Sequence, residues 1–184
     1  AIIPAGEAVT WQYNVTNNGA SPFNAWGLCV ADNMVFASTK VVSGLTGGVY
    51  AVDALTGEFK WAYKGGFFNM TPPVVQDGVV FFSGIGDPVR AVYADTGALK
   101  WQSTNVTGST HYDAIMVADG KVFIIVGGGS TWMYCLDAET GASLWATYIP
   151  RAWWAESTPA YADGKVYVAM NETINGVRVY NASN

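Results

Sequence analysis

The sequence contains little charge, two cysteines and a single histidine. Charged residues make up 12% of its 184 residues and hydrophobic residues make up 51%, a balance that excludes a disordered chain. The net charge is −5 and Lys and Arg form no cluster, so the basic patch that binds nucleic acid is absent. No apolar run approaches the ~18 residues of a membrane-spanning helix. We therefore expect a folded domain with no nucleic-acid partner and no membrane span.

Metal-binding and redox patterns are also missing. His111 is the only histidine, and neither Cys29 nor Cys135 stands in a Cys-x-x-Cys spacing. We therefore expect no metal site. The two cysteines are interpreted as small buried side chains, with a disulfide as the alternative. The repeats described below place them on different sheets, which disfavours the disulfide.

A repeated motif is the strongest signal that the sequence does contain. Thr-Gly-x-x-x-Trp occurs three times, with its glycines at Gly57, Gly97 and Gly141 and its tryptophans at Trp61, Trp101 and Trp145. Asp-Gly or Asp-Asn, followed by alternating apolar residues, begins at Asp32, Asp77, Asp119 and Asp163. The two motifs interleave and share one period of about 40–45 residues, which indicates tandem structural units.

Each motif has a mechanical explanation. Asp-Gly and Asp-Asn between apolar runs predict tight β-hairpins, because these residues tolerate positive φ. In Asp-Ala-x-Thr-Gly the glycine supplies a left-handed turn, and the Asp and Thr side chains accept hydrogen bonds from free amides. The tryptophan on the following strand then packs as a wedge between neighbouring sheets.

Four strands in one such repeat match the size of a propeller blade. A four-stranded sheet has two faces to bury and must stack on neighbours. We predict an all-β fold: a β-propeller of four four-stranded antiparallel blades in a single domain, residues 1–184. The expected blades are 22–63, 68–103, 111–148 and 154–184.

The pattern around these tryptophans resembles the tryptophan-docking repeat of the pyrroloquinoline-quinone (PQQ) dehydrogenase propellers and of their cofactor-free relatives, the outer-membrane assembly lipoproteins. The resemblance is carried by residues 52–61, 92–101 and 136–145. It implies a propeller, and in the dehydrogenases a calcium site, a catalytic Asp and often adjacent cysteines. No adjacent cysteines occur here. We expect no cofactor and no catalytic residue, since the chain resembles the cofactor-free members more.

The last blade lacks a fourth strand in the repeat alignment. Residues 6–13, which include Trp11, resemble the fourth strand of the first repeat. We expect this segment to complete the last blade, because unpaired edge strands associate with other chains. The strand pairs either within its own chain, closing a ring, or with a neighbouring copy, giving a ring or polymer. A longer parent protein is the remaining alternative.

The sequence also predicts glycosylation and an external location. Asn-x-Ser/Thr triplets begin at Asn14, Asn69, Asn105, Asn171 and Asn181, which is more than the composition predicts by chance. The first residue is Ala1, not Met, which suits either a removed signal peptide or a truncated chain. We expect an extracellular or cell-surface glycoprotein.

Three functions fit these features. The first is a structural protein that assembles with copies of itself through strand complementation, as a filament, sheath or ring. The second is a monomeric propeller that binds protein or carbohydrate, with Trp153 and Trp154 as a candidate exposed aromatic contact. The third is a fragment of a PQQ-dependent dehydrogenase, for which Asp113 and Glu156 are the acids to watch.

Overall fold

The structure is a computed structural model of the 184-residue chain. It describes residues 11, 13, 25–39, 47–65, 68–106, 115–127, 130–149, 158–170 and 176–183. Several residues singled out from the sequence lie outside these ranges: Asn14, His111, Asp113, Trp153, Trp154, Glu156 and Asn171. Within the described ranges all regular structure is β-strand, as the sequence predicts.

Four sheets follow one another along the chain, and neighbouring strands in each sheet run antiparallel. The first contains β1 (Ala25–Ala31), β2 (Met34–Thr39), β3 (Gly48–Asp53) and β4 (Phe59–Lys64). The second contains β6 (Val74–Gln76), β7 (Val79–Phe82), β9 (Arg90–Tyr93) and β10 (Leu99–Gln102). The third contains β11 (Ile115–Ala118), β12 (Lys121–Val126), β13 (Thr131–Asp137) and β14 (Ser143–Ile149). The fourth contains three strands among the described residues: β15 (Ala160–Ala162), β16 (Lys165–Met170) and β17 (Gly176–Asn181).

A small additional sheet was not expected from the sequence. β5 (Phe68–Met70) pairs with β8 (Gly84–Ile85), and β5 contacts β1 and β2 of the first sheet. The glycines around Gly84 read as a plain loop in the sequence. A two-residue strand gives no periodic signal, so sequence reasoning had no means of finding it.

The hairpins between the first two strands of each sheet form as predicted. At Asp119 and Gly120 φ is 52° and 68°, and the other three hairpins also have positive φ at Asp32, Asp77 and Asp163. Positive φ at both central positions gives a turn whose twist matches that of the flanking strands. Asp and Gly therefore set the register of each hairpin.

In the first and third sheets the turn before the fourth strand is held by an aspartate side chain; in the second sheet Tyr93 stands at that position. In the first sheet, Oδ1 of Asp53 accepts hydrogen bonds from the amides of Leu55 and Thr56 at 3.0 and 2.8 Å. The amide of Gly57 donates to the Asp53 carbonyl at 2.9 Å, with φ of +72° at the glycine. Asp137 makes the equivalent bonds in the third sheet. Hydrogen bonds from Thr56, its amide above all, lower the pKa of Asp53, and the hydroxyl and amide of Thr140 lower the pKa of Asp137.

The core lies between the sheets. Because side chains alternate along a strand, each middle strand faces two neighbours. In β12, for example, Val122 and Ile124 pack toward the second sheet, while Phe123 and Ile125 pack toward the fourth. The apolar clusters fill the three junctions between successive sheets. Sheets stacked through both faces in this way form a β-propeller arrangement.

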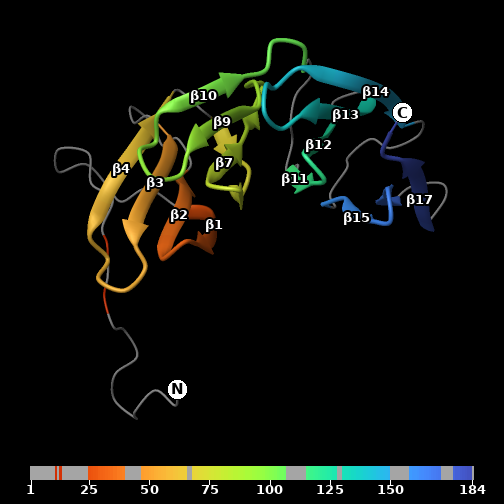
Figure 1. Cartoon of the computed structure of the whole chain (residues 1–184). Helices are drawn as coiled ribbons and strands as arrows, with labels where there is room; N and C mark the ends of the chain where they lie inside the picture. The colour runs from red at the N-terminus through yellow and green to blue at the C-terminus, as the bar shows by residue number, and fades with distance from the viewer. Residues whose placement is uncertain are drawn as a thin grey trace.

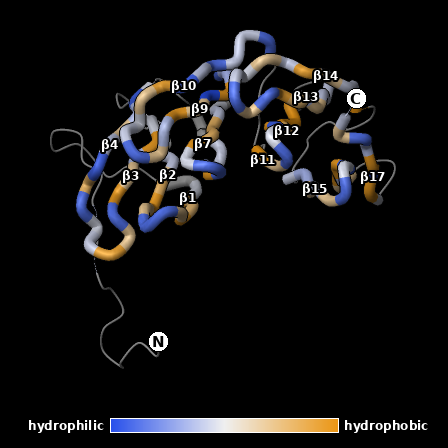
Figure 2. The backbone as a smooth tube through the Cα atoms, in the orientation of Figure 1, coloured by the Kyte–Doolittle hydropathy of each residue, from blue (hydrophilic) through white to orange (hydrophobic). Residues whose placement is uncertain are grey.

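The sheets form an arc in which the first and the fourth lie at opposite ends (Figure 1). Their inner strands contact in succession, β1 with β6, β6 with β11 and β11 with β15. Figure 2 shows hydrophobic residues along the strands and, at one open end of the arc, on β17. The described residues thus form an open arc, not a four-bladed ring closed within one chain.

Candidate functional site

One tryptophan docks on each of the four sheets. The indole Nε1 of Trp61 donates to the Ala94 carbonyl at 2.8 Å, and Trp101 donates to Ala138 at 2.9 Å. Trp145 makes the same bond to Ala182 at 3.3 Å. In each case the acceptor is the alanine of the turn in the next sheet. The indoles therefore join neighbouring sheets by one repeated hydrogen bond.

A glycine beneath the rings of Trp11, Trp61 and Trp101 makes this docking fit. A Cβ at Gly97 would lie 2.6 Å from the ring of Trp61, and one at Gly141 would lie 2.5 Å from Trp101. Both glycines also have a positive φ. No other residue combines this backbone with this contact, so the glycines and tryptophans act as one unit.

The first sheet receives its tryptophan from the N-terminal segment. Nε1 of Trp11 donates to the Ala54 carbonyl at 3.1 Å, and its ring lies 2.6 Å from a Cβ placed on Gly57. The ring of Tyr13 stacks on Phe59 with centroids 5.8 Å apart. Trp11 thus occupies the position that the tryptophan of a preceding blade would take. Of residues 6–13, the structure describes these two.

The side of the fourth sheet that faces away from the third sheet is exposed to solvent. We call it the C-terminal end face and define it by Ala160, Tyr167, Ala169, Val177 and Val179, which share one side of the sheet. Val177 and Val179 are 65% and 51% exposed. The residues at the position of Val179 in the earlier sheets, Ala51, Ala91 and Cys135, are 0% exposed. A face that is buried at every earlier junction is therefore uncovered here.

The side of the first sheet that faces away from the second sheet is exposed in one half and buried in the other. We call it the N-terminal end face and define it by Leu28, Val30, Tyr50, Val52 and Phe59. Near the inner edge, Leu28 and Val30 are each 62% exposed. Near Trp11 and Tyr13, Tyr50 and Val52 are buried. Burial raises the pKa of Tyr50, and the nearby Tyr13 adds to this rise.

Sequence reasoning missed both end faces. Their signal was present, because β17 alternates Val177 and Val179 with Arg178 and Tyr180. Such alternation predicts one apolar side of a strand. It does not say whether that side meets a neighbour, which required the order of the sheets in space.

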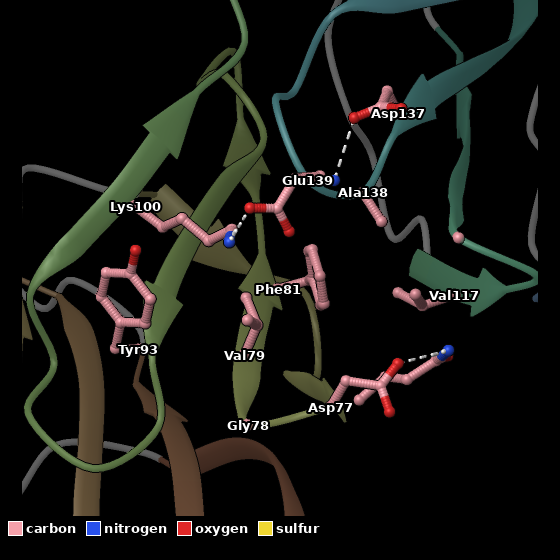
Figure 3. A pocket seen from close by; sticks show the side chains of 12 residues that line it. Asp77, Gly78, Val79, Phe81, Tyr93, Lys100, Val117, Asp137, Ala138 and Glu139 are labelled. Atoms are coloured by element: carbon pink, nitrogen blue, oxygen red, sulfur yellow. Dashed lines mark hydrogen bonds and ion pairs between the residues drawn. The ribbon is translucent and has the colours of Figure 1, made fainter.

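A groove lies between the second and third sheets (Figure 3). Its volume is about 400 Å³, and Val79, Phe81 and Val117 form its apolar wall. At its mouth Lys100 Nζ lies 2.7 Å from Glu139 Oε1 and 5.4 Å from the ring centre of Tyr93. The hydrogen bond that Lys100 donates to Glu139 raises the pKa of Lys100.

This groove recurs at other sheets and is a feature of the repeat. A groove of about 520 Å³ beside Lys60 and Asp95 lies between the first two sheets. Another of about 320 Å³ lies on the fourth sheet beside Lys165, Val179 and Asn181. No group of three or more His, Cys, Asp or Glu able to hold a metal ion occurs in the described ranges. The grooves do not single out a catalytic centre.

The remaining predicted residues are spread over the surface and core. Asn105 is exposed after β10, and Asn69 lies in β5. Oδ1 of Asn181 accepts a hydrogen bond from the Ser183 hydroxyl at 2.9 Å, so this residue takes the turn role that Asp53 has in the first sheet. Cys29 and Cys135 are free thiols on β1 and β13. Burial raises the pKa of Cys135 to about 11.

The comparisons with known proteins agree with this architecture. The family model described as outer membrane protein assembly factor BamB matches residues 1–113 and 86–184. A protein of that name from Shewanella oneidensis is 32% identical over 133 residues, which cover 65% of this chain and 32% of the relative. The chain thus spans about a third of that relative's length.

A polyvinylalcohol dehydrogenase from a Sphingopyxis species is 27% identical over 168 residues, which cover 75% of this chain and 23% of the enzyme. The crystal structure of BamB from Moraxella catarrhalis superposes with a TM-score of 0.67 and 21% identity, over 85% of this chain and 46% of that one. In the part of the chain that the structure describes, no helix has the length and apolar character to cross a membrane. The chain therefore belongs to the PQQ-like repeat family represented by the outer membrane protein assembly factor BamB.

Proposed function

We propose that this chain is a non-enzymatic propeller scaffold that binds other protein chains through its two end faces, and that the first of these partners is a second copy of itself. In this proposal residues 6–13 of one copy complete the fourth sheet of another. The observation that carries the proposal is the exposure of Val177 and Val179, whose counterparts in the first three sheets are buried.

The pairing of β3 with β4 and of β13 with β14 predicts the register of the added strand. Trp61 lies opposite Ala51, and Trp145 lies opposite Cys135. Val179 holds the same place in β17, two residues before the turn residue Asn181. Trp11 of the added strand therefore lies opposite Val179, and Tyr13 lies opposite Val177. The exposed valines are the residues that this strand would cover.

The docked position of Trp11 also supports strand addition. The indole already binds Ala54 and Gly57 of its own first sheet, so Trp11 is held beside the N-terminal end face. A fourth sheet arriving from another copy would pack on that face and meet the strand there. Main-chain hydrogen bonds to the outer edge of β17 would then provide affinity.

The relatives favour a scaffold over an enzyme. The chain covers 23% of the dehydrogenase that it matches, and it lacks the adjacent cysteines that the resemblance to the PQQ enzymes implies. The name of the BamB relatives describes a factor that assembles outer membrane proteins. We extend to this chain a role in protein binding outside the cytoplasm, at the cell envelope or surface.

Glycosylation is part of this proposal. Asn105 is exposed in the turn after β10 and begins a triplet. The Nδ2 atom of Asn181 is not needed for its turn, which uses Oδ1. Intact mass of material from the native source, before and after enzymatic deglycosylation, tests all five triplets. An unchanged mass that equals the polypeptide mass would remove this part of the proposal.

Charged side chains on the C-terminal end face test the scaffold proposal. We expect the 184-residue chain to associate in sedimentation velocity and the double variant Val177→Lys, Val179→Lys to sediment as a monomer. Leu144→Lys is the matched control, because Leu144 is also exposed on a strand but lies outside both end faces. An unmodified chain that is monomeric, or a double variant that associates like the control, would contradict the proposal.

A further inference from the structure

The turn before the fourth strand of the second sheet lacks the carboxylate that its two counterparts contain. In the first sheet Oδ1 of Asp53 accepts hydrogen bonds from the amides of Leu55 and Thr56 and from the Thr56 hydroxyl, at 3.0, 2.8 and 3.0 Å. Asp137 accepts the equivalent three bonds in the third sheet, at 3.0, 2.8 and 2.8 Å. In the second sheet Tyr93 stands at this position. The second turn therefore offers three donors without the carboxylate that the other two turns supply.

The second turn nevertheless keeps the shape of the other two. The amide of Gly97 donates to the Tyr93 carbonyl at 2.8 Å, and the amide of Tyr93 donates to the Ala98 carbonyl at 2.9 Å. The corresponding bonds of the first sheet are 2.9 and 2.8 Å long, and φ of the turn glycine is +70° in the second sheet and +72° in the first. The donors are thus held in place before an acceptor arrives, which lowers the entropy lost on binding.

The three donors are the amide of Asp95, the amide of Thr96 and the Thr96 hydroxyl. In the part of the chain that the structure describes, none of them has an acceptor. Both residues are exposed, so a group from another molecule can reach them. We propose that these donors bind an aspartate or glutamate side chain of a partner protein, whose carboxylate takes the place that Asp53 and Asp137 take in their own turns.

A lysine beside the turn supplies a positive charge for the second carboxylate oxygen. In the first sheet Lys60 Nζ lies 4.0 Å from Asp53 Oδ2. Lys100 follows Tyr93 at the same spacing at which Lys60 follows Asp53. Its Nζ lies 5.4 Å from the ring centre of Tyr93 and 2.7 Å from Glu139 Oε1 (Figure 3). A carboxylate on the turn therefore meets an ammonium group as well as three hydrogen-bond donors.

Asp95 itself adds a negative charge to the turn. The third turn carries Glu139 at the equivalent position, and it still holds the Asp137 carboxylate. Hydrogen bonds from the hydroxyl and amide of Thr140 lower the pKa of Asp137, so the ionised form is favoured there. Three donors in this arrangement thus outweigh an acidic neighbour.

A protein side chain is the source of carboxylate that suits this site. Hydrogen bonds at an exposed turn contribute little on their own, because water competes for the donors. A side chain on a protein that docks elsewhere on the scaffold is presented to the turn at a high effective concentration. The turn belongs to the second sheet and to neither end face, so this contact goes beyond the proposed function and does not depend on it.

An NMR titration of the 184-residue chain tests the site. The probes are sodium acetate and a blocked Ala-Asp-Ala peptide, added at constant ionic strength. We expect saturable shifts of the amides of Asp95 and Thr96 with both probes, and none with the blocked Ala-Asn-Ala peptide. The amides of Leu55 and Thr56 are the internal control, because Asp53 already occupies their turn.

Substitutions in the turn provide a second readout. Tyr93→Asp supplies the missing carboxylate from the chain itself, so we expect it to abolish the acetate response, whereas Tyr93→Phe retains it. Thr96→Val removes one donor and should weaken acetate binding about tenfold. Thr56→Val is the matched control in the first turn and should leave acetate binding unchanged.

Four results would each overturn the proposal. Equal shifts in the first and second turns mean a non-specific effect of the anion. An acetate response that survives Tyr93→Asp places the site elsewhere. Inorganic phosphate that binds more tightly than acetate means a general anion site. Acetate that binds while the Ala-Asp-Ala peptide does not means a small carboxylate, not a protein. The sedimentation test of the scaffold is separate, so either proposal can fail alone.

Discussion

The ring of Trp61 lies on Gly97 of the neighbouring sheet so closely that a Cβ there would approach it to 2.6 Å. The same indole donates its N–H to Ala94, three residues earlier in the turn. The Trp61 side chain thus makes both a close steric contact and a hydrogen bond with the next turn. We regard this contact as the unit from which the stack of sheets is built.

Alanine at Gly97 tests the steric half of this contact. We expect Gly97→Ala to destabilise the protein by about 1–2 kcal/mol for its left-handed backbone and by about 1–3 kcal/mol more for the clash with the ring. Gly78→Ala is the matched control, since Gly78 has φ of +71° but nothing within 4 Å of its Cβ. Urea denaturation measures both. Equal losses in the two variants would show that ring contact has no energetic role.

Phenylalanine at Trp61 tests the polar half. The substitution leaves the buried Ala94 carbonyl without its indole donor, and we expect a loss of about 1–3 kcal/mol. Trp132→Phe is the control, because Trp132 is exposed and contacts Tyr148; there we expect a change within about 0.5 kcal/mol. Similar losses in both variants would contradict the docking account.

Acid is expected to weaken the docking turns. Hydrogen bonds from the amides and hydroxyls of Thr56 and Thr140 hold the pKa of Asp53 and Asp137, respectively, below the ordinary value. A depressed folded pKa gives stability that is complete above the unfolded pKa of about 3.9 and is lost as pH falls through the folded value. We therefore expect the melting temperature to fall below about pH 4.

Asparagine at both positions separates this effect from the rest of the acid response. Asn181 shows that an amide Oδ1 can hold the same turn, so Asp53→Asn, Asp137→Asn should fold and show a shallower decline. Asp87 acts in the opposite direction, because burial raises its pKa, and the comparison between variants cancels it. An unchanged pH profile in the double variant would contradict this assignment.

The thiol of Cys135 should be unreactive in the folded protein. It is buried on β13 and its pKa is raised to about 11, so the thiolate is scarce at neutral pH. We expect a thiol reagent at pH 8 to modify Cys135 only after unfolding in denaturant. Mass spectrometry of digested peptides identifies the site. Rapid modification of Cys135 in the native protein would show that the third junction opens.

The fold could be predicted from sequence because its decisive residues are local. Asp119 and Gly120 specify a hairpin wherever they occur between apolar runs, and Gly97 with Trp101 marks the next turn and strand. Four such hairpins and three such turns, sharing one period, imply stacked sheets. The wedge role of Trp61 followed from its place on the fourth strand, and the structure shows it between the first two sheets.

The binding surfaces could not be predicted in the same way, because exposure depends on the order of sheets in space. Val179 and Cys135 hold equivalent positions, but one is 51% exposed and the other 0%. Only the absence of a following sheet among the described residues distinguishes them. The sequence predicts Trp11 as a docking tryptophan but leaves open whether the turn that receives it belongs to the same chain; in the structure it is Ala54 of the same chain.

The mass of the assembled protein in solution tests the central claim most directly. Sedimentation equilibrium of the 184-residue chain should give a mass well above the 19.6 kDa of one copy. Removing residues 1–13, which takes away Trp11 and Tyr13 together, should give single copies. A full chain that stays at 19.6 kDa across concentrations, or a shortened chain that still pairs, would contradict the account.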